Sequence, residues 1–286
     1  MEAYAMTLEQ IESYGKTLRL AERCEATIQK YVGAATAFFD FLPEGKSVTK
    51  ELALAWKAEI SAKNAASTVN VMLSAVNRFF SFMSWDGLRI KRLKTQRRIY
   101  RDCDRELTKA EYARLLDAAR QRGNLRLYYL TQTLAATGIR VSELRFVTVE
   151  SLRSGATVVD CKGQRREILV PKNLRRKLLA YCEEVGITSG SVFVTRSGKP
   201  MNRSNIWREL QSLCDAAHVD RRKVFPHNFR HLFAVTFYRM EKDIAKLADL
   251  LGHASINTTR NCASSLWKPS GTGARSWTAR ASGASS

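Results

Sequence analysis

The residues of this chain that could do chemistry are imidazoles and guanidiniums spaced to meet around an anion. The segment Pro226–His231 reads Pro-His-Asn-Phe-Arg-His. His227 and Arg230 are three residues apart, which places both side chains on one face of a helical turn, within reach of a single anionic group. A further imidazole, His253, follows Gly252, and a glycine there is typical of the end of a helix. The pattern predicts an anion-binding site.

Two earlier segments add cations to this set. Arg140 stands in Ala-Thr-Gly-Ile-Arg-Val-Ser-Glu-Leu, after a glycine that is expected to end a helix. A guanidinium fork suits two phosphate oxygens, whereas a surface ion pair with Glu143 is the competing interpretation. Lys162 stands in Asp-Cys-Lys-Gly-Gln-Arg-Arg, on a predicted β turn, where a lysine is usually just exposed. Arg165 and Arg166 beside it are candidate phosphate contacts.

The charge of the chain indicates a polyanionic partner. The 286 residues carry a formal net charge of +20 and give a pI of about 10.0, and nucleic acid is the default partner of such a protein. An acidic membrane is disfavoured, because the sequence has neither a long apolar run nor a signal-peptide pattern; a cytoplasmic protein is expected. The six cysteines are scattered and the four histidines lack zinc-ligand spacing, so no metal and no cofactor is predicted.

The first half of the chain is expected to hold a small helical domain and a basic linker. Residues 8–88 carry apolar residues at helical spacing, with helices expected over about 22–42, 49–61 and from Ser67 to Met83. Residues 89–105 are dense in positive charge. They are well placed to cross a phosphate backbone, although a solvated connector is the alternative. The candidate DNA-binding residues of this linker are Arg89, Lys91, Arg92, Lys94, Arg97 and Arg98.

A larger domain over residues 106–262 is predicted to be mainly helical, opened by a capping box between Thr108 and Glu111. Alternating apolar residues over 145–171 predict a three-stranded antiparallel sheet. Helices are expected over 109–121, 125–136, 174–185, 204–216, 229–239 and 242–251. Residues 263–286 are rich in Ala, Ser and Gly without periodicity, and are expected to be a disordered tail. The fold class is therefore mainly α with a small antiparallel β-sheet.

These motifs resemble the tyrosine recombinase (phage integrase) family. The match spans roughly residues 15–262 and includes the A-T-G-x-R-x-S-E-L pattern around Arg140, the P-H-x-L-R-H pattern with Phe229 in place of leucine, and the L-G-H element at His253. The resemblance implies a two-domain DNA clamp, with a helical core-binding domain and a tyrosine-recombinase catalytic domain. It implies site-specific DNA recombination or integration by a homotetramer on double-stranded DNA, through covalent phosphotyrosine intermediates.

The resemblance also implies a role for each candidate residue. Arg140 and Arg230 would clamp the scissile phosphate. Lys162 would act as general acid for the leaving hydroxyl, and His227 would transfer a proton. His253 would hydrogen-bond the same phosphate. Fixed cations are what such a reaction needs, because charge develops on the non-bridging oxygens of the phosphorus centre.

The nucleophile is where the chain departs from the family. The family's tyrosine lies nine residues after the second histidine, and that position is occupied by Cys262. A thiolate attacks phosphodiesters poorly and its side chain is shorter than a phenol, so the chain is expected to be cleavage-defective. A catalytically dead DNA-binding protein that occupies recombination sites is the alternative, and a basic transcriptional regulator is a more distant one. The change of composition after Cys262 also suggests out-of-frame translation, which the nucleotide sequence would test.

Overall fold

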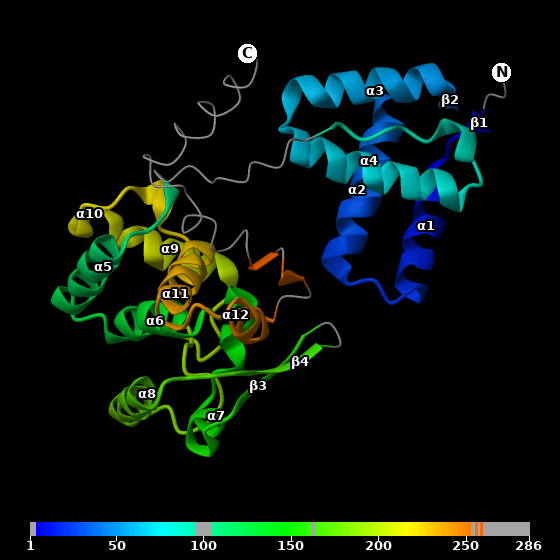
Figure 1. The fold of residues 1–286 in the computed structure, drawn as a ribbon. Coiled ribbons are helices and arrows are strands. Elements are labelled where there is room, and N and C mark those ends of the chain that lie inside the picture. The colour runs from blue at the N-terminus through cyan, green and yellow to red at the C-terminus, as the bar shows by residue number, and fades with distance from the viewer. Residues whose placement is uncertain (1–3, 95–104, 162–163, 253–254, 257, 260–286) are drawn as a thin grey trace, which may run out of the picture. The chain divides into compact units, whose positions relative to one another are not determined.

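The structure is a computed structural model that describes residues 4–94, 105–161, 164–252, 255–256 and 258–259. The chain divides into two compact units, residues 1–97 and 98–286, and both are built mainly of helices (Figure 1). The small antiparallel pairings, one in each unit, join two strands apiece within the part of the chain described. None of the helices in that part is both long and apolar enough to cross a membrane.

The first unit is a bundle of helices around an aromatic core. Its elements are β1 (Tyr4–Ala5), α1 (Leu8–Leu20), α2 (Glu25–Phe41), β2 (Ser47–Val48), α3 (Lys50–Lys63), α4 (Ala66–Phe82) and a 3-10 turn, η1 (Asp86–Leu88). The rings of Phe38 and Trp56 meet edge to face at 5.2 Å, and those of Phe38 and Phe80 at 5.6 Å. The three predicted helices are confirmed, except that α4 begins at Ala66 and not after a Ser67 cap.

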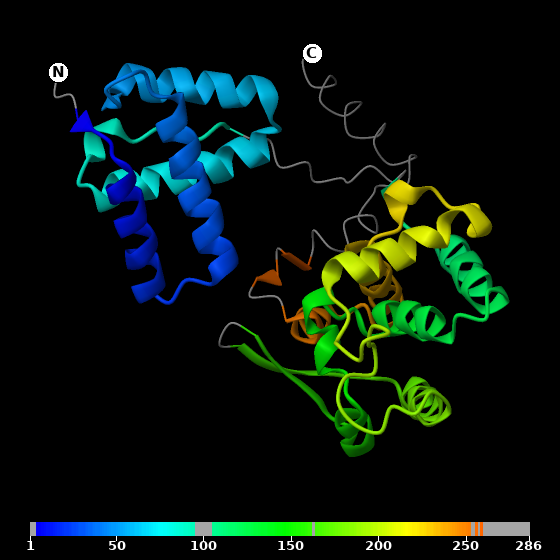
Figure 2. The ribbon, with the colours of Figure 1, turned by 180° about the vertical axis from the view of Figure 1, so that it is seen from behind.

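The second unit is organised around one central helix, α6. Its elements are α5 (Lys109–Gln121), α6 (Leu125–Thr137), η3 (Val141–Phe146), α7 (Val149–Ser154), β3 (Thr157–Cys161), β4 (Gln164–Ile168), α8 (Lys172–Glu184), α9 (Arg203–Ser212), α10 (Cys214–Ala217), η4 (Arg221–Lys223), α11 (Pro226–Glu241) and α12 (Ile244–Leu251) (Figure 2). Helix α6 packs against α5, α8, α9 and α11. Leu130 and Leu134 on α6 are fully buried, so α6 fixes the relative positions of the surrounding helices.

The predicted three-stranded sheet is wrong, since the described residues between 145 and 171 form two strands. β3 and β4 pair antiparallel, from Thr157 opposite Ile168 to Cys161 opposite Gln164. In place of the expected first strand, Val147 follows the end of η3 and Val149 begins α7, and Thr148 between them makes only an isolated antiparallel bridge to Ser191. Thr148 caps α7 through a reciprocal capping box with Ser151, and this local cap outweighs the alternation of valines. The helix expected over 204–216 is likewise divided, into α9 and α10.

Glycines end two helices that lead into the candidate site, as predicted. Gly138 ends α6 with φ of 58° and Gly252 ends α12 with φ of 60°. Both values lie in the left-handed region, which costs an ordinary residue about 1–2 kcal/mol. Around Gly138 there is also no room, because a Cβ there would lie 2.5 Å from Cδ1 of Phe233. Glycine is therefore the residue that fits this turn without backbone strain or a clash.

Replacing Gly138 with alanine is expected to destabilise the second unit by about 1–3 kcal/mol, from backbone strain together with the contact at Phe233. Urea unfolding measures the loss. Gly123→Ala is the matched control, because its φ of 63° imposes the same strain while nothing lies within 4 Å of the added Cβ. Equal losses for the two variants would show that the close packing around Gly138 contributes nothing.

Candidate functional site

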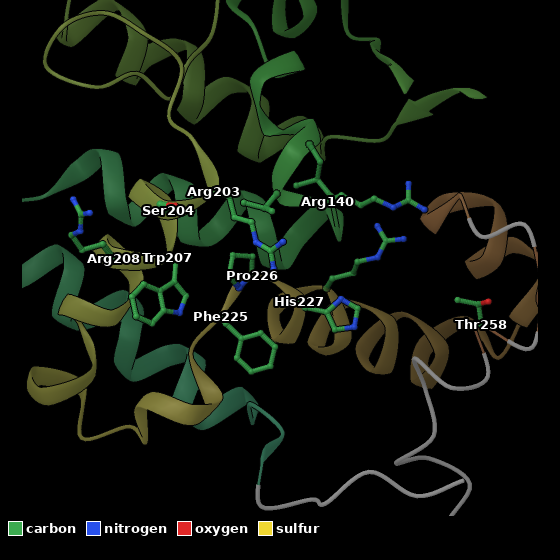
Figure 3. A pocket seen from close by; sticks show the side chains of 12 residues that line it. Arg140, Arg203, Ser204, Trp207, Arg208, Phe225, Pro226, His227 and Thr258 are labelled. Atoms are coloured by element: carbon green, nitrogen blue, oxygen red, sulfur yellow. The ribbon is translucent and has the colours of Figure 1, made fainter. Parts of the chain in front are cut away.

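Helix α11 brings the predicted pair His227 and Arg230 to one cavity. Pro226 occupies its first turn, where a fixed φ and a missing N–H suit a helix start. Both members of the pair line a cavity of about 830 Å³ together with Arg140 (Figure 3). The structure therefore gathers the three described residues of the predicted site in one place.

The cavity is strongly cationic. Its arginines are Arg140, Arg203, Arg208 and Arg230, joined by the imidazole of His227. Among the described residues that line it, none is a carboxylate. Such a lining suits an anion with several oxygens, because each guanidinium offers a planar fork of N–H donors.

Arg140 is oriented by two hydrogen bonds and still faces the cavity. Its Nη1 donates to Oε1 of Glu143 at 2.8 Å, and its Nη2 donates to the carbonyl of Gly252 at 2.7 Å. The ion pair with Glu143 was the competing interpretation of this arginine, and it is present. Arg140 nevertheless remains 40% exposed and lines the cavity, and these bonds use only two of its five N–H donors. The pair fixes the direction of the guanidinium without saturating it.

Glu143 is a buried carboxylate that joins two arginines. Its side chain is 1% exposed, and Oε2 accepts from the backbone N–H of Arg140 at 3.0 Å and from Nη2 of Arg166 at 2.5 Å. Burial raises the pKa of Glu143, but the hydrogen bonds from Arg140 and Arg166 outweigh burial and hold that pKa below its usual range. The carboxylate is therefore ionised at neutral pH and acts as a fixed counter-charge behind the cavity.

Three arginines hold the C-terminal end of α12. The last carbonyls of a helix lack partners within it and carry the negative end of its dipole. Here three successive carbonyls each accept from a different guanidinium: Leu250 from Arg166 at 2.5 Å, Leu251 from Arg230 at 2.5 Å and Gly252 from Arg140 at 2.7 Å. His253 comes next in the chain and lies outside the described residues. The point from which it departs is thus fixed by the arginines of the site.

Arg166 and Arg230 have structural duties that the sequence did not indicate. Arg166 was expected to contact DNA, but its side chain is 12% exposed and its bonds run to Glu143 and to α12. It is a largely buried tether, because it binds an internal carboxylate and a helix end at the same time. Arg230 is 3% exposed, and its Nη1 also donates to the carbonyl of Gly138 at 2.6 Å, so it ties the end of α6 to the end of α12.

Two further residues of α11, Asn228 and His231, contact the beginning of the second unit. Asn228 and His231 repeat the spacing of the cavity pair, shifted by one residue. Nδ2 of Asn228 donates to the carbonyl of Arg105 at 2.6 Å, and Nε2 of His231 lies 3.2 Å from Oε1 of Glu106. One helical turn thus presents one pair to the cavity and another to Arg105 and Glu106, where the basic linker ends.

The start of the linker is held against the first unit. Asn77 exchanges hydrogen bonds with the backbone of Ile90, both at 2.8 Å, and Asn70 does the same with Leu93 at 2.8 and 3.0 Å. These contacts bury Ile90 and leave the alternating basic side chains exposed. The exposed candidates are Arg89, Lys91, Arg92 and Lys94.

Several predicted residues lie outside the described part of the chain. They are Arg97, Arg98, Lys162, His253 and Cys262, and the side chain of Arg165 is not described either. Lys162 falls in the sequence between β3 and β4.

One wall of the cavity was missed by the sequence interpretation. It is formed by α9, which contributes Arg203, Ser204, Trp207 and Arg208 to the lining. These residues recur at helical spacing around the buried Ile206, which is a signal that the sequence does contain. Nothing in a single sequence, however, shows that α9 and α11 line the same cavity.

Comparison with known proteins identifies the family. Residues 105–265 match the phage integrase family, and residues 1–87 match the phage integrase N-terminal SAM-like domain. The tyrosine recombinase XerA of Pyrococcus furiosus is 29% identical over 271 residues, which cover 91% of each chain. The tyrosine recombinase XerD of Vibrio cholerae is 30% identical over 204 residues, 66% of this chain and 67% of its own.

Solved structures share the fold. A λ integrase dimer bound to a COC′ core site matches with a TM-score of 0.74 at 17% identity, over 93% of this chain and 79% of that one. A λ integrase tetramer bound to a Holliday junction matches with a TM-score of 0.70 at 19% identity, over 90% and 78%. Both domains, the order of the motifs and the sequence matches agree, and the chain belongs to the phage integrase family, the tyrosine recombinases.

Proposed function

We propose that the function for which this fold is built is site-specific recombination of double-stranded DNA, and that the cavity of this chain holds the scissile phosphate. The observation that carries the proposal is the cavity itself, where four arginines and a histidine converge and the described lining includes no carboxylate. Membership of the tyrosine recombinase family supports the same assignment. In this proposal Arg140 and Arg230 clamp the phosphate, and Lys162 and His253 complete the set.

The reaction follows from the charges around the phosphorus. A hydroxyl oxygen forms a bond to phosphorus while the bond to the 5′ oxygen breaks, and negative charge grows on the non-bridging oxygens. Guanidiniums fixed beforehand, as Arg140 is by Glu143 and Gly252, stabilise that charge without having to reorganise. The leaving 5′ oxygen takes a proton from Lys162, and His227 transfers the proton of the attacking hydroxyl.

The residue at the nucleophile position leads us to propose that the chain with Cys262 does not cleave DNA. Cysteine offers a shorter side chain and a nucleophile poorly matched to a phosphodiester. A second candidate function is therefore occupation of recombination sites by a DNA-binding protein that cannot cut. Cys262 is the observation that favours it, and the basic charge of the chain supports DNA binding in both cases.

The organisation of the chain on DNA is also a proposal. We infer a core-binding domain over residues 8–88, a linker over 89–105 that crosses the phosphate backbone, and a catalytic domain over 106–262, followed by a tail over 263–286. The exposure of the first basic residues of the linker supports its role. Assembly as a homotetramer is proposed from the likeness to the λ integrase tetramer.

Trapping of a covalent intermediate tests the proposed function. The probe is a pool of nicked duplexes of random sequence, from which a cleaved fragment can diffuse away so that rejoining is prevented. We expect no trapped DNA with the chain as it stands, and recovery of trapping when residues from 262 onward are replaced by a tyrosine-bearing family tail. Denaturing gels measure the covalent product.

The same replacement tail with phenylalanine in place of its tyrosine is the control, and it should trap nothing. Trapping by the unaltered chain would show that Cys262 is not a barrier to cleavage. If the repaired chain neither traps nor binds DNA, the assignment of the cavity to a DNA phosphate is wrong.

A further inference from the structure

Helix α9 carries an exposed tryptophan into the wall of the cavity. Ile206 and Leu210 on its inner face are buried, whereas Trp207 is 51% exposed. Arg203 lies four residues before Trp207 and therefore shares its face of the helix. An isolated exposed aromatic residue is ordinary on a protein surface. This one is not isolated, because it lines the same cavity as the proposed phosphate clamp.

The aromatic part of the cavity has no task in phosphoryl transfer. Trp207 and Phe225 both line it, and in Figure 3 their rings point toward the end away from Thr258. Indole carries no charge and no group that exchanges a proton at neutral pH. The guanidiniums of Arg140 and Arg230 are sufficient to bind the phosphate. The aromatic wall can therefore contact the group that is attached to that phosphate.

We propose that Trp207 forms a nucleobase subsite, where its indole stacks on an unpaired base next to the phosphate held by Arg140 and Arg230. This inference rests on the proposed function. A base is joined to its phosphate through one sugar, so it comes within reach once the phosphate is bound. Every base has a π-face, and aromatic side chains in cationic grooves bind bases by stacking without reading their sequence. Arg203 supplies the cation beside the indole.

The ligand is an unpaired base because a base in an intact duplex does not expose its face. Strand exchange requires a cleaved strand to leave its partner, and the bases beside the break then lose their pairing. The cost of unstacking is least for a base that is already unpaired. A subsite at Trp207 therefore favours the opened state that strand exchange passes through.

The chain's own tail is a less suitable occupant on grounds of charge. Residues 260–286 contain Arg260, Lys268, Arg275 and Arg280 and no acidic residue. Bringing this segment into a cavity lined by four arginines would place like charges together. DNA supplies the opposite charge.

The test uses the full chain, needs no cleavage, and compares two DNA probes. One is a short paired duplex, and the other is the same duplex with a central run of unpaired bases that includes 2-aminopurine. We expect the chain to prefer the second probe and to quench its 2-aminopurine fluorescence. Trp207→Ala should weaken binding to the opened probe by roughly 5- to 100-fold and abolish quenching, and should leave affinity for the paired duplex unchanged. Trp207→Phe should keep most of the preference.

Met240→Ala is the matched control, since Met240 is an exposed apolar residue of α11 outside the cavity lining; it should alter neither probe's binding. Equal losses on both probes with Trp207→Ala would make Trp207 a general backbone contact and overturn the subsite. Equal affinity of the wild type and Trp207→Ala for the opened probe would also overturn the subsite. If the preference for the opened probe appeared only after residues 263–286 had been removed, the tail would be the group that contacts the indole in the full chain, and the subsite would be overturned. Failure to bind either probe would overturn the proposed function as well.

Discussion

Replacing Arg140 with alanine, in a chain whose tyrosine-bearing tail has been restored, is expected to slow strand cleavage by about 10²–10³. DNA affinity should change little, because the basic surface as a whole holds the duplex. The guanidinium is aimed into the cavity by Glu143 and Gly252, so its removal withdraws a preorganised donor from the charge that develops on the phosphate. Single-turnover cleavage under saturating protein measures the rate, and a filter or gel titration measures affinity.

Two further variants separate the effect of the planar guanidinium from the effect of its positive charge and of its position. Arg140→Lys keeps the charge but loses the planar fork, and should recover only part of the rate. Arg145→Ala removes the same charge from the 3-10 helix that Arg140 precedes, at an exposed residue whose guanidinium lies 4.9 Å from the ring of Phe146 and outside the cavity lining. It should cleave at the unaltered rate. A loss of DNA affinity as large as the loss of rate would make Arg140 an anchor for the duplex.

Local signals in the sequence predicted the elements that lead into the site. Thr108 and Glu111 form the expected capping box, with the N–H of Glu111 donating to the Thr108 hydroxyl at 3.2 Å. Gly138 and Gly252 end their helices in the left-handed conformation, as expected. Such signals act within a few residues, where the chain's own geometry decides the outcome. That is why helix ends near the site were predicted well.

The support of the site could not be predicted, because it depends on residues that are distant in sequence. Arg140 reaches a carbonyl 112 residues away and Arg166 one 84 residues away. Neither spacing leaves a mark on the sequence, so Arg166 was interpreted as a candidate phosphate contact. The valines at 147 and 149 misled for the opposite reason. Their alternation is a weak local signal, and the cap at Thr148 is a stronger one.

The arrangement of charges behind the cavity follows from one buried acid. Arg140 directly precedes η3 and Arg166 lies in β4, and both contact Glu143. An isolated buried guanidinium would be costly, and a carboxylate shared between two of them offsets that cost only while it is ionised. The sequence Arg-Val-Ser-Glu therefore encodes the clamp together with its counter-charge.

Glu143→Gln is accordingly expected to destabilise the second unit by about 3–5 kcal/mol, the cost of breaking a buried ion pair by removing one partner. The amide keeps the shape of the carboxylate but leaves Arg166, at 12% exposure, without its counter-charge. Urea unfolding measures the loss. Glu241→Gln is the matched control within the same unit, because Glu241 pairs with Lys246 at 2.9 Å on the surface, and exposed pairs contribute about 0.2–1 kcal/mol.

The pH dependence of the stability difference between the wild type and Glu143→Gln shows whether the charge of Glu143 causes it. The pKa of Glu143 is held below its usual range in the folded chain, whereas in the unfolded chain it returns to about 4.3. Its contribution is therefore fully present above the unfolded value and is lost as the pH falls through the lower, folded value. The stability gap between the wild type and Glu143→Gln should be constant from neutral pH down to about 5, and should close in more acidic solution. A gap that persists in acid would show that the variant fails through packing, and that the charge of Glu143 does not hold the arginines in place.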